Sequence, residues 1–255
     1  SGDAATYTVG ICQLVQHEAL DAATQGFIDA LNEALPGQVK FEEKNASGDS
    51  NSCATIVNGF VSEGVDLIMA NATAALQAAA SATSDIPVLG TSITAYGVAL
   101  DIDDFSGTVG GNVSGTTDMN PIEEQIDLLM QLVPEAKTVG LIYNSGEDNS
   151  ILQAQLATEA IQARNMAVTE VTVTSTNDVQ QAMQSLVTKC DAIYIPTDNT
   201  LASSMPIVEG VCTEAKKPVI CGESSMVDAG GLATLSINYY KLGYQTGMMA
   251  LRILV

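Results

Sequence analysis

The sequence predicts an α/β protein made of two Rossmann-like lobes with parallel sheets. Short apolar strands alternate with helices of 10–18 residues, a pattern typical of βαβ units. Three strand-and-loop segments also recur at a nearly constant offset along the chain. A length of 255 residues with 46% hydrophobic and 4% aromatic content fits one large or two medium domains with aliphatic cores.

The first half is expected to contain four strands and three long helices. Apolar or alternating runs predict strands at residues 7–15, 38–46, 65–71 and 86–91. The first predicted helix spans residues 17–35 and carries an apolar stripe formed by Leu20, Ala23, Phe27, Ala30, Leu31 and Leu35. Two further helices are predicted at residues 51–64, ending at a glycine, and at the alanine-rich residues 73–83.

The second half repeats this pattern. Residues 138–144, 191–200 and 217–224 match residues 8–14, 66–75 and 86–93, at offsets of 130, 125 and 131 residues. The repeat predicts two similar lobes, formed by residues 1–117 plus 236–255 and by residues 118–235. The last helix, at residues 239–254, is expected to follow a strand at residues 232–238 and to return to the first lobe. Gly110, Gly111 and Gly115 are interpreted as hinge and turn glycines at the junction.

Composition restricts the function. Thirty acidic and nine basic residues give a net charge of −21, which opposes binding to nucleic acid or an anionic membrane. The five cysteines form no CxxC motif and are expected to be buried free thiols. With one histidine, no P-loop and no nucleophile elbow, the chain favours binding over catalysis, without a metal or cofactor. The small, polar residues 1–6 are typical of a tether left after processing.

Two predicted helix starts offer groups that suit an anion. "NAT" at residues 71–73 and "DNS" at residues 148–150 each follow a strand of the repeat. Unpaired amides at such a start, with the hydroxyl of Thr73 or Ser150 beside them, suit a carboxylate. The alternative is ordinary helix capping by Asn71, Thr73, Asn149 and Ser150.

Other polar residues at strand ends suit a cation. Asp198 and Glu223 each follow a buried strand, and either carboxylate can hold an ammonium group. The alternatives are a helix N-cap for Asp198 and a solvated loop acid for Glu223. Gln13 and His17 flank the exit of the first strand, and Tyr96 and Tyr143 are candidate walls for an apolar side chain. An anion site opposite a cation site fits a zwitterion, of which an α-amino acid is the simplest small example.

The chain resembles the substrate-binding proteins of ABC importers, in the family that includes tryptophan- and other aromatic-amino-acid-binding members. The resembling stretches cover nearly the whole chain and include "VGICQLVQHEALDAATQGF", "DLIMANATAALQAA", "IPVLGTSIT", "YNSGEDNS" and "DAIYIPTDNT". The resemblance implies the type I periplasmic-binding-protein architecture, in which a hinge joins two lobes around a ligand cleft. It also implies delivery to a membrane permease with its ATPase, and no catalysis.

The resemblance and the residue patterns together define the candidate ligand contacts. They are Gln13, His17, Ala72, Thr73, Thr91, Asp118, Tyr143, Asn149, Ser150, Asp198, Asn199 and Glu223, with Asp118 at the family's hinge. We expect a monomeric, extracytoplasmic protein, periplasmic or lipid-anchored at the outer face of the cell membrane. Its expected ligand is a free aromatic or large aliphatic amino acid. The alternatives are a ligand-sensing domain of the same fold for another small polar metabolite, and a two-lobed enzyme.

Overall fold

The structure, a computed structural model, describes residues 6–255 and confirms the predicted fold class, with two α/β units that each contain a parallel sheet. One unit comprises Ser1–Met119 and Asn238–Val255, and the other comprises Asn120–Ile237. The chain therefore passes between the units at residues 119–120 and 237–238, two residues beyond each predicted boundary. Residues 1–5 of the expected tether lie outside the described residues.

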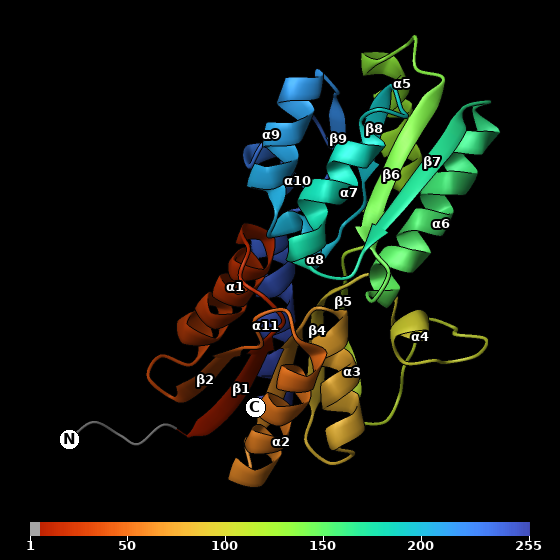
Figure 1. The fold of residues 1–255 in the computed structure, drawn as a ribbon. Coiled ribbons are helices and arrows are strands. Elements are labelled where there is room, and N and C mark those ends of the chain that lie inside the picture. Colours follow the sequence, from red (N-terminus) through yellow and green to blue (C-terminus); the bar gives the residue numbers. More distant parts are fainter. Residues whose placement is uncertain (1–5) are drawn as a thin grey trace. The chain divides into compact units, whose positions relative to one another are not determined.

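The first unit is built on a five-stranded sheet in the order β2-β1-β3-β4-β5, with every pair parallel. Its strands are β1 Tyr7–Gln13, β2 Val39–Asn45, β3 Leu67–Asn71, β4 Val88–Ile93 and β5 Val113–Thr117. Helices α1 Glu18–Ala34 and α11 Tyr239–Leu254 cover one face, and α2 Ser50–Glu63 and α3 Thr73–Ala82 cover the other (Figure 1). Every residue of β3 is buried, as expected for a strand covered on both faces.

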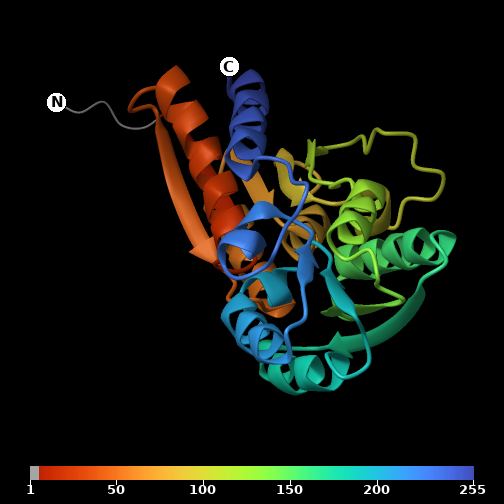
Figure 2. The same ribbon diagram turned by 90° about the horizontal axis from the view of Figure 1, so that it is seen from above.

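Helices α1 and α11 come from opposite ends of the chain and lie side by side in both ribbon views (Figure 2). Glycines permit this close approach. A Cβ at Gly26 would overlap the carbonyl of Tyr240, and a Cβ at Gly243 would overlap the carbonyl of Ala23. The contact buries Phe27 of α1 and Ala250 of α11 against the sheet, so the last helix completes the core of the first unit.

The second unit has a four-stranded parallel sheet in the order β7-β6-β8-β9. Its strands are β6 Thr138–Asn144, β7 Ala167–Val173, β8 Ala192–Ile195 and β9 Val219–Cys221. Helices α5 Ile122–Leu132 and α6 Asp148–Ala163 pack on one face, and α7 Val179–Leu186 and α9 Met205–Ala215 pack on the other. Shorter helices are α4 Tyr96–Ala99, α8 Asn199–Ala202, α10 Ser224–Asp228 and a 3-10 turn at Thr176–Asp178.

The sequence repeat corresponds to equivalent positions in the two sheets. The matched strands are β1 with β6, β3 with β8, and β4 with β9, and each pair occupies the same place in its strand order. The carboxyl ends of these strands therefore carry the matched loops. The second unit has no counterpart of β5 among its described strands.

Two details of the sequence interpretation are wrong. The strand expected at residues 232–238 is only an isolated bridge between Ala233 and Ile220. Beyond this bridge the Leu235 carbonyl accepts a hydrogen bond from the side chain of Gln125, at 2.7 Å, so the pairing does not continue. Gly115 is not a hinge glycine but lies inside β5, where a Cβ would overlap Gly90 and the Tyr96 hydroxyl. Its φ of +150° also suits glycine.

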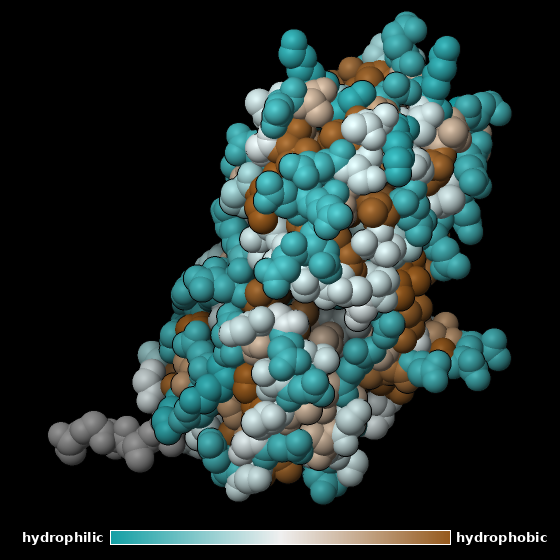
Figure 3. Space-filling model, in the orientation of Figure 1, coloured by the Kyte–Doolittle hydropathy of each residue, from teal (hydrophilic) through white to brown (hydrophobic). Residues whose placement is uncertain are grey.

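The surface and the thiols agree with the composition. All five cysteines are free and buried, as predicted. Hydrophilic side chains cover much of the face shown in Figure 3, with apolar residues between them. Within residues 6–255, no helix has both the length and the apolar character needed to cross a membrane.

Candidate ligand-binding site

In the second unit, two carboxylates link two neighbouring loops. One loop joins β6 to α6 and the other joins β8 to α8, and β6 and β8 are adjacent parallel strands. Asp198 from the second loop reaches the first loop, while Glu147 from the first loop reaches the second. Each loop is therefore held by an acid that the other loop supplies.

Asp198 is buried, with 1% of its surface exposed. Its Oδ2 accepts hydrogen bonds from the Asn144 N–H and the Ser150 hydroxyl, both at 2.7 Å, and its Oδ1 accepts from the Leu201 N–H at 2.7 Å. The last contact confirms the helix-cap interpretation of Asp198. Burial, with the charge of Glu147 as the second cause, raises the pKa of Asp198 to about 7 despite these donors.

Glu147 is the main site residue that sequence reasoning missed. Its Oε2 accepts from the N–H of Asn199 at 3.1 Å and from that residue's Nδ2 at 2.9 Å. Its Oε1 accepts from the N–H and the hydroxyl of Thr200 at 3.1 and 2.9 Å. Its place inside "YNSGEDNS", before a helix start, was the available signal.

Four predicted contacts, Asn149, Ser150, Asp198 and Asn199, are thus brought together on these two loops. Asn149 and Ser150 lie in the first turn of α6, whose cap position, Glu147, makes no side-chain capping bond to the helix. Gln153, which was also missed, exchanges two hydrogen bonds with the backbone of Thr197, at 2.9 and 3.1 Å. A glutamine one turn after Asn149 on the buried face of a helix was a detectable polar signal.

Glu223 and Tyr143 lie apart from this pair of loops. Glu223 follows β9, is 1% exposed and caps α10 by accepting from the N–H groups of Ser225 and Met226, so the solvated-acid alternative is wrong. Tyr143 packs on the α5 and α6 side of the sheet, and its hydroxyl donates to Glu170 of β7 at 2.8 Å. Burial and this hydrogen bond raise the pKa of Tyr143 to about 12.

In the first unit, Gln13 and Thr91 belong to a buried polar layer beneath α1 and α11. The Thr24 hydroxyl donates to Gln13 Oε1 at 2.8 Å, and Asn71 Nδ2 donates to the Thr24 hydroxyl at 3.0 Å. The Thr91 hydroxyl lies 3.4 Å from that of Thr116. Asn71 therefore binds α1 and does not cap α3, and Thr91 pairs with Asn71 in the strand register.

His17 and Asp118 mark other edges of this unit. His17 occupies the N-cap position of α1 and is half-buried. Asp118 follows β5 with 3% of its surface exposed, and its Oδ2 accepts from the Tyr239 hydroxyl at 2.7 Å. Since Tyr239 opens α11, this bond links the two places where the chain leaves and re-enters the first unit.

The start of α3 combines an open helix end with unusual backbone. Thr73 begins the helix, and neither it nor the preceding residue, Ala72, makes a side-chain capping bond. Ala72 has φ +95° and ψ 161°, a region that is nearly exclusive to glycine, and Ser92 on the neighbouring strand has φ +57°. Such conformations cost on the order of 1–3 kcal/mol each and cluster at functional sites.

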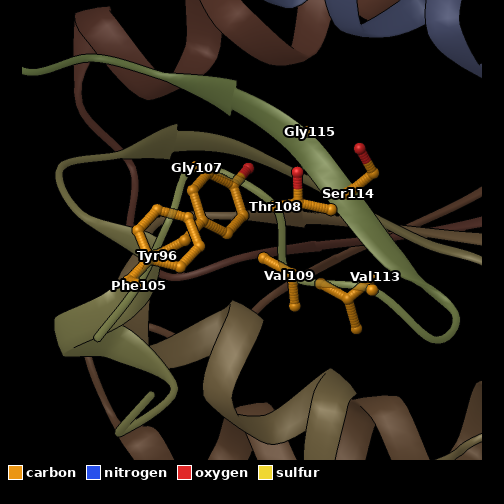
Figure 4. A pocket seen from close by; sticks show the side chains of 9 residues that line it. Tyr96, Phe105, Gly107, Thr108, Val109, Val113, Ser114 and Gly115 are labelled. Carbon is orange, nitrogen blue, oxygen red and sulfur yellow. The ribbon is translucent and has the colours of Figure 1, made fainter. Parts of the chain in front are cut away.

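A separate cavity of about 330 Å³ lies along the outer edge of β5 (Figure 4). The rings of Tyr96 and Phe105 and the side chains of Val109 and Val113 line it. It lies beside the first residues of β5, whereas the candidate contacts lie at the carboxyl ends of the strands. The Tyr96 hydroxyl is bound to two backbone carbonyls, so Tyr96 supplies a ring wall to this cavity.

The arrangement suits recognition of a small polar ligand. The second unit presents carboxylates at its strand ends, and the first presents a helix start with free capping capacity, which suit a cation and an anion respectively. Ligand sites in open parallel sheets occur at such strand ends. The fold and these loops define a two-lobed α/β binding protein.

Comparison with known proteins gives the family. A family model described as "ABC transporter substrate binding protein" matches residues 8–255, so the chain belongs to this family of extracytoplasmic binding proteins. Proteins of this kind bind a small molecule and work with the permease and ATPase of an ABC transporter. A relative named tyrosine-binding protein, from Clostridioides difficile, is 40% identical over 252 residues, which cover 96% of this chain and 72% of the relative.

Solved structures agree with this assignment. An ABC domain from Streptococcus pneumonia in complex with L-Trp has a TM-score of 0.94 and 36% identity, with 98% of this chain and 85% of that chain covered. A ligand-free, open substrate-binding protein with adhesive properties from Clostridium difficile has a TM-score of 0.70 and 42% identity, covering 97% and 85%. A leucine-binding protein from Thermotoga maritima, at 15% identity, shares the fold.

Proposed function

We propose that this protein binds a free aromatic or large aliphatic α-amino acid and delivers it to the permease of an ABC importer. The observation that carries the proposal is the buried Asp198 carboxylate at a strand end, beside a second acid, Glu147. A ligand ammonium placed there relieves the repulsion between the two acids and adds a charge-assisted hydrogen bond. The relatives described as tyrosine-binding and L-Trp-bound support an aromatic ligand.

We propose that the carboxylate of the same ligand binds at the start of α3 in the first unit. Thr73 is 5% exposed and begins a helix with no capping side chain, so its first-turn N–H groups are available to a carboxylate. The first unit thus suits an anion and the second unit suits a cation, and an α-amino acid carries both charges. Among the predicted contacts, Thr73, Asn149, Ser150, Asp198, Asn199 and Glu223 are proposed to act at these strand ends, and Asp118 at the hinge.

Isothermal titration of the purified protein against the twenty amino acids tests the ligand class. We expect micromolar binding of L-tyrosine or L-tryptophan, which corresponds to about −8 kcal/mol. Replacing Asp198 with alanine should weaken that binding by more than ~10-fold, because a hydrogen bond to a charged group contributes about 1.5–3 kcal/mol. An absence of heat with all twenty amino acids would refute the ligand class.

We further propose that the protein acts without catalysis or a cofactor and is a monomer, either periplasmic or lipid-anchored at the outer face of the membrane. The family assignment supports the extracytoplasmic location. Mass spectrometry of a bound amino acid recovered after prolonged incubation should show it chemically unchanged. Native mass spectrometry should give the mass of one chain plus one ligand, and a dimer mass would contradict the monomer.

A further inference from the structure

Ser92 carries two features that packing within the first unit does not explain. Its side chain is 7% exposed, and its hydroxyl has no hydrogen-bond partner among residues 6–255. Its φ of +57° lies in the left-handed region, which serine rarely adopts. Buried polar groups almost always find a partner, so an orphaned hydroxyl on a strained residue needs a functional reason.

The backbone at Ser92 is a bulge that interrupts the alternation of β4. Pairing with β5 shifts register between Gly90 and Ile93. Thr91 belongs to the polar layer under α11, while Ile93 belongs to the apolar cluster on the opposite face, under α2 and α3. Ser92 is therefore the extra residue, and bulges of this kind re-aim a side chain beside functional sites.

The register locates Ser92 beside the open end of α3. The Thr91 carbonyl accepts the N–H of Ala72 at 3.1 Å, and Thr91 pairs with Asn71. One step further along the two strands, Ser92 stands next to Ala72, and α3 begins at Thr73. The orphaned hydroxyl and the uncapped helix start therefore lie at the same point of the sheet edge.

We infer that Ser92 is a ligand-binding residue whose hydroxyl donates a hydrogen bond to the carboxylate of the amino acid, beside the first-turn N–H groups of α3. This inference rests on the proposed function and adds a residue that the strand-and-loop pattern did not single out. A hydroxyl in this position completes a set of donors for a carboxylate. The left-handed backbone at Ser92 is a strained conformation of the kind that clusters at ligand-binding sites.

Two substitutions at this position separate ligand binding from folding. Ser92→Ala removes the hydroxyl and keeps the left-handed backbone, whereas Ser92→Gly removes the hydroxyl and relieves the backbone. A matched control is Ser204→Ala, because Ser204 is also buried and its hydroxyl also has no partner among residues 6–255, but it lies in the second unit, at the N-cap position of α9. All three variants are compared with the wild type by thermal unfolding without ligand and by titration with L-tyrosine and L-tryptophan.

We expect Ser92→Ala to unfold at the wild-type temperature or above and to bind the amino acid at least ~10-fold more weakly. Ser92→Gly should unfold at a higher temperature than Ser92→Ala and show the same loss of affinity, and Ser204→Ala should keep wild-type affinity. Wild-type affinity in Ser92→Ala, with a wild-type protein that binds, overturns this inference alone. A wild-type protein that binds none of the amino acids refutes the proposed function and the inference together.

Discussion

Because the Glu147 carboxylate links the two loops of the second unit, we expect Glu147→Gln to destabilise the protein. Every group that faces the Glu147 carboxylate is a donor: the N–H and side chain of Asn199, the N–H and side chain of Thr200, and Asn149 Nδ2 at 3.3 Å. A glutamine turned either way sets its NH₂ against one backbone N–H, that of Asn199 or that of Thr200, while the Thr200 hydroxyl can turn and accept instead. The substitution therefore abolishes at least one hydrogen bond to a charged acceptor and leaves the remaining donors with a neutral partner.

The cost can be worked out from these contacts. One such bond contributes about 1.5–3 kcal/mol. Glu147 is half-buried, so water can reach part of the altered site, and loss of its charge removes repulsion from Asp198. We therefore expect the free energy of unfolding to fall by about 1–2 kcal/mol. Urea denaturation measures this as a lower midpoint with an unchanged slope.

The same variant changes the titration of Asp198. Because the charge of Glu147 is a cause of the raised pKa of Asp198, about 7 in the wild type, Glu147→Gln should lower that pKa. The raised value means that the folded protein binds more protons than the unfolded chain between about pH 4 and pH 7, so this group's contribution to stability falls as pH rises through that range. In Glu147→Gln, the pH range over which Asp198 lowers the stability should become narrower.

Carbon-13 NMR of the labelled Asp198 carboxyl group measures the midpoint directly. Glu214→Gln serves as the control, since it removes the same charge from an exposed position of α9. A midpoint for Asp198 that stays in place or rises in Glu147→Gln would refute the reasoning about the paired acids. A stability loss equal to that of the control would refute the role of the exchanged hydrogen bonds.

Two further predictions concern the first unit. Gly243→Ala should destabilise the protein by at least about 2 kcal/mol, because its Cβ meets the Ala23 carbonyl at the α1–α11 crossing. Gly59→Ala in α2, where nothing lies within 4 Å of the added Cβ, should stabilise the protein by up to about 1 kcal/mol, and chemical denaturation compares the two variants. Tyr239→Phe should lower the unfolding free energy by about 1.5–3 kcal/mol through the lost bond to buried Asp118. Tyr244→Phe removes a solvent-exposed bond to Glu33 and should change the unfolding free energy by less than about 0.5 kcal/mol, so equal effects would contradict the first estimate.

Much of the fold followed from hydrophobic periodicity. The buried strands β1, β3, β4, β6, β8 and β9 were predictable because continuous apolar runs of this length have few other uses. Strand β5 was missed because "VSGTT" is short, polar and interrupted by Gly115. Conversely, residues 232–238 have the apolar pattern of a strand, but their backbone bonds to β9 come from Leu232 and Ala233, and the Leu235 carbonyl accepts from the side chain of Gln125 in α5.

The candidate site was predictable where it depends on strand ends and less so where it depends on side-chain partners. The positions of Ser150 and Asp198 followed from the repeat, yet the sequence did not reveal that they bind each other at 2.7 Å. Glu147 was overlooked because an acid in a glycine- and serine-rich loop usually faces solvent. The backbone at Ser92 has no sequence signature, since a positive φ at serine is imposed by the surrounding sheet.

The return of α11 to the first unit has a consequence for biosynthesis. Residues 120–237 form one continuous stretch of the chain, so the second unit can fold as soon as this stretch leaves the ribosome. The sheet and α1 of the first unit, although made earlier, lack the partner that covers one face until residues 239–254 have been added. We therefore expect the middle of the chain to mature before its beginning, and the unfinished amino-terminal portion to be the part that chaperones protect.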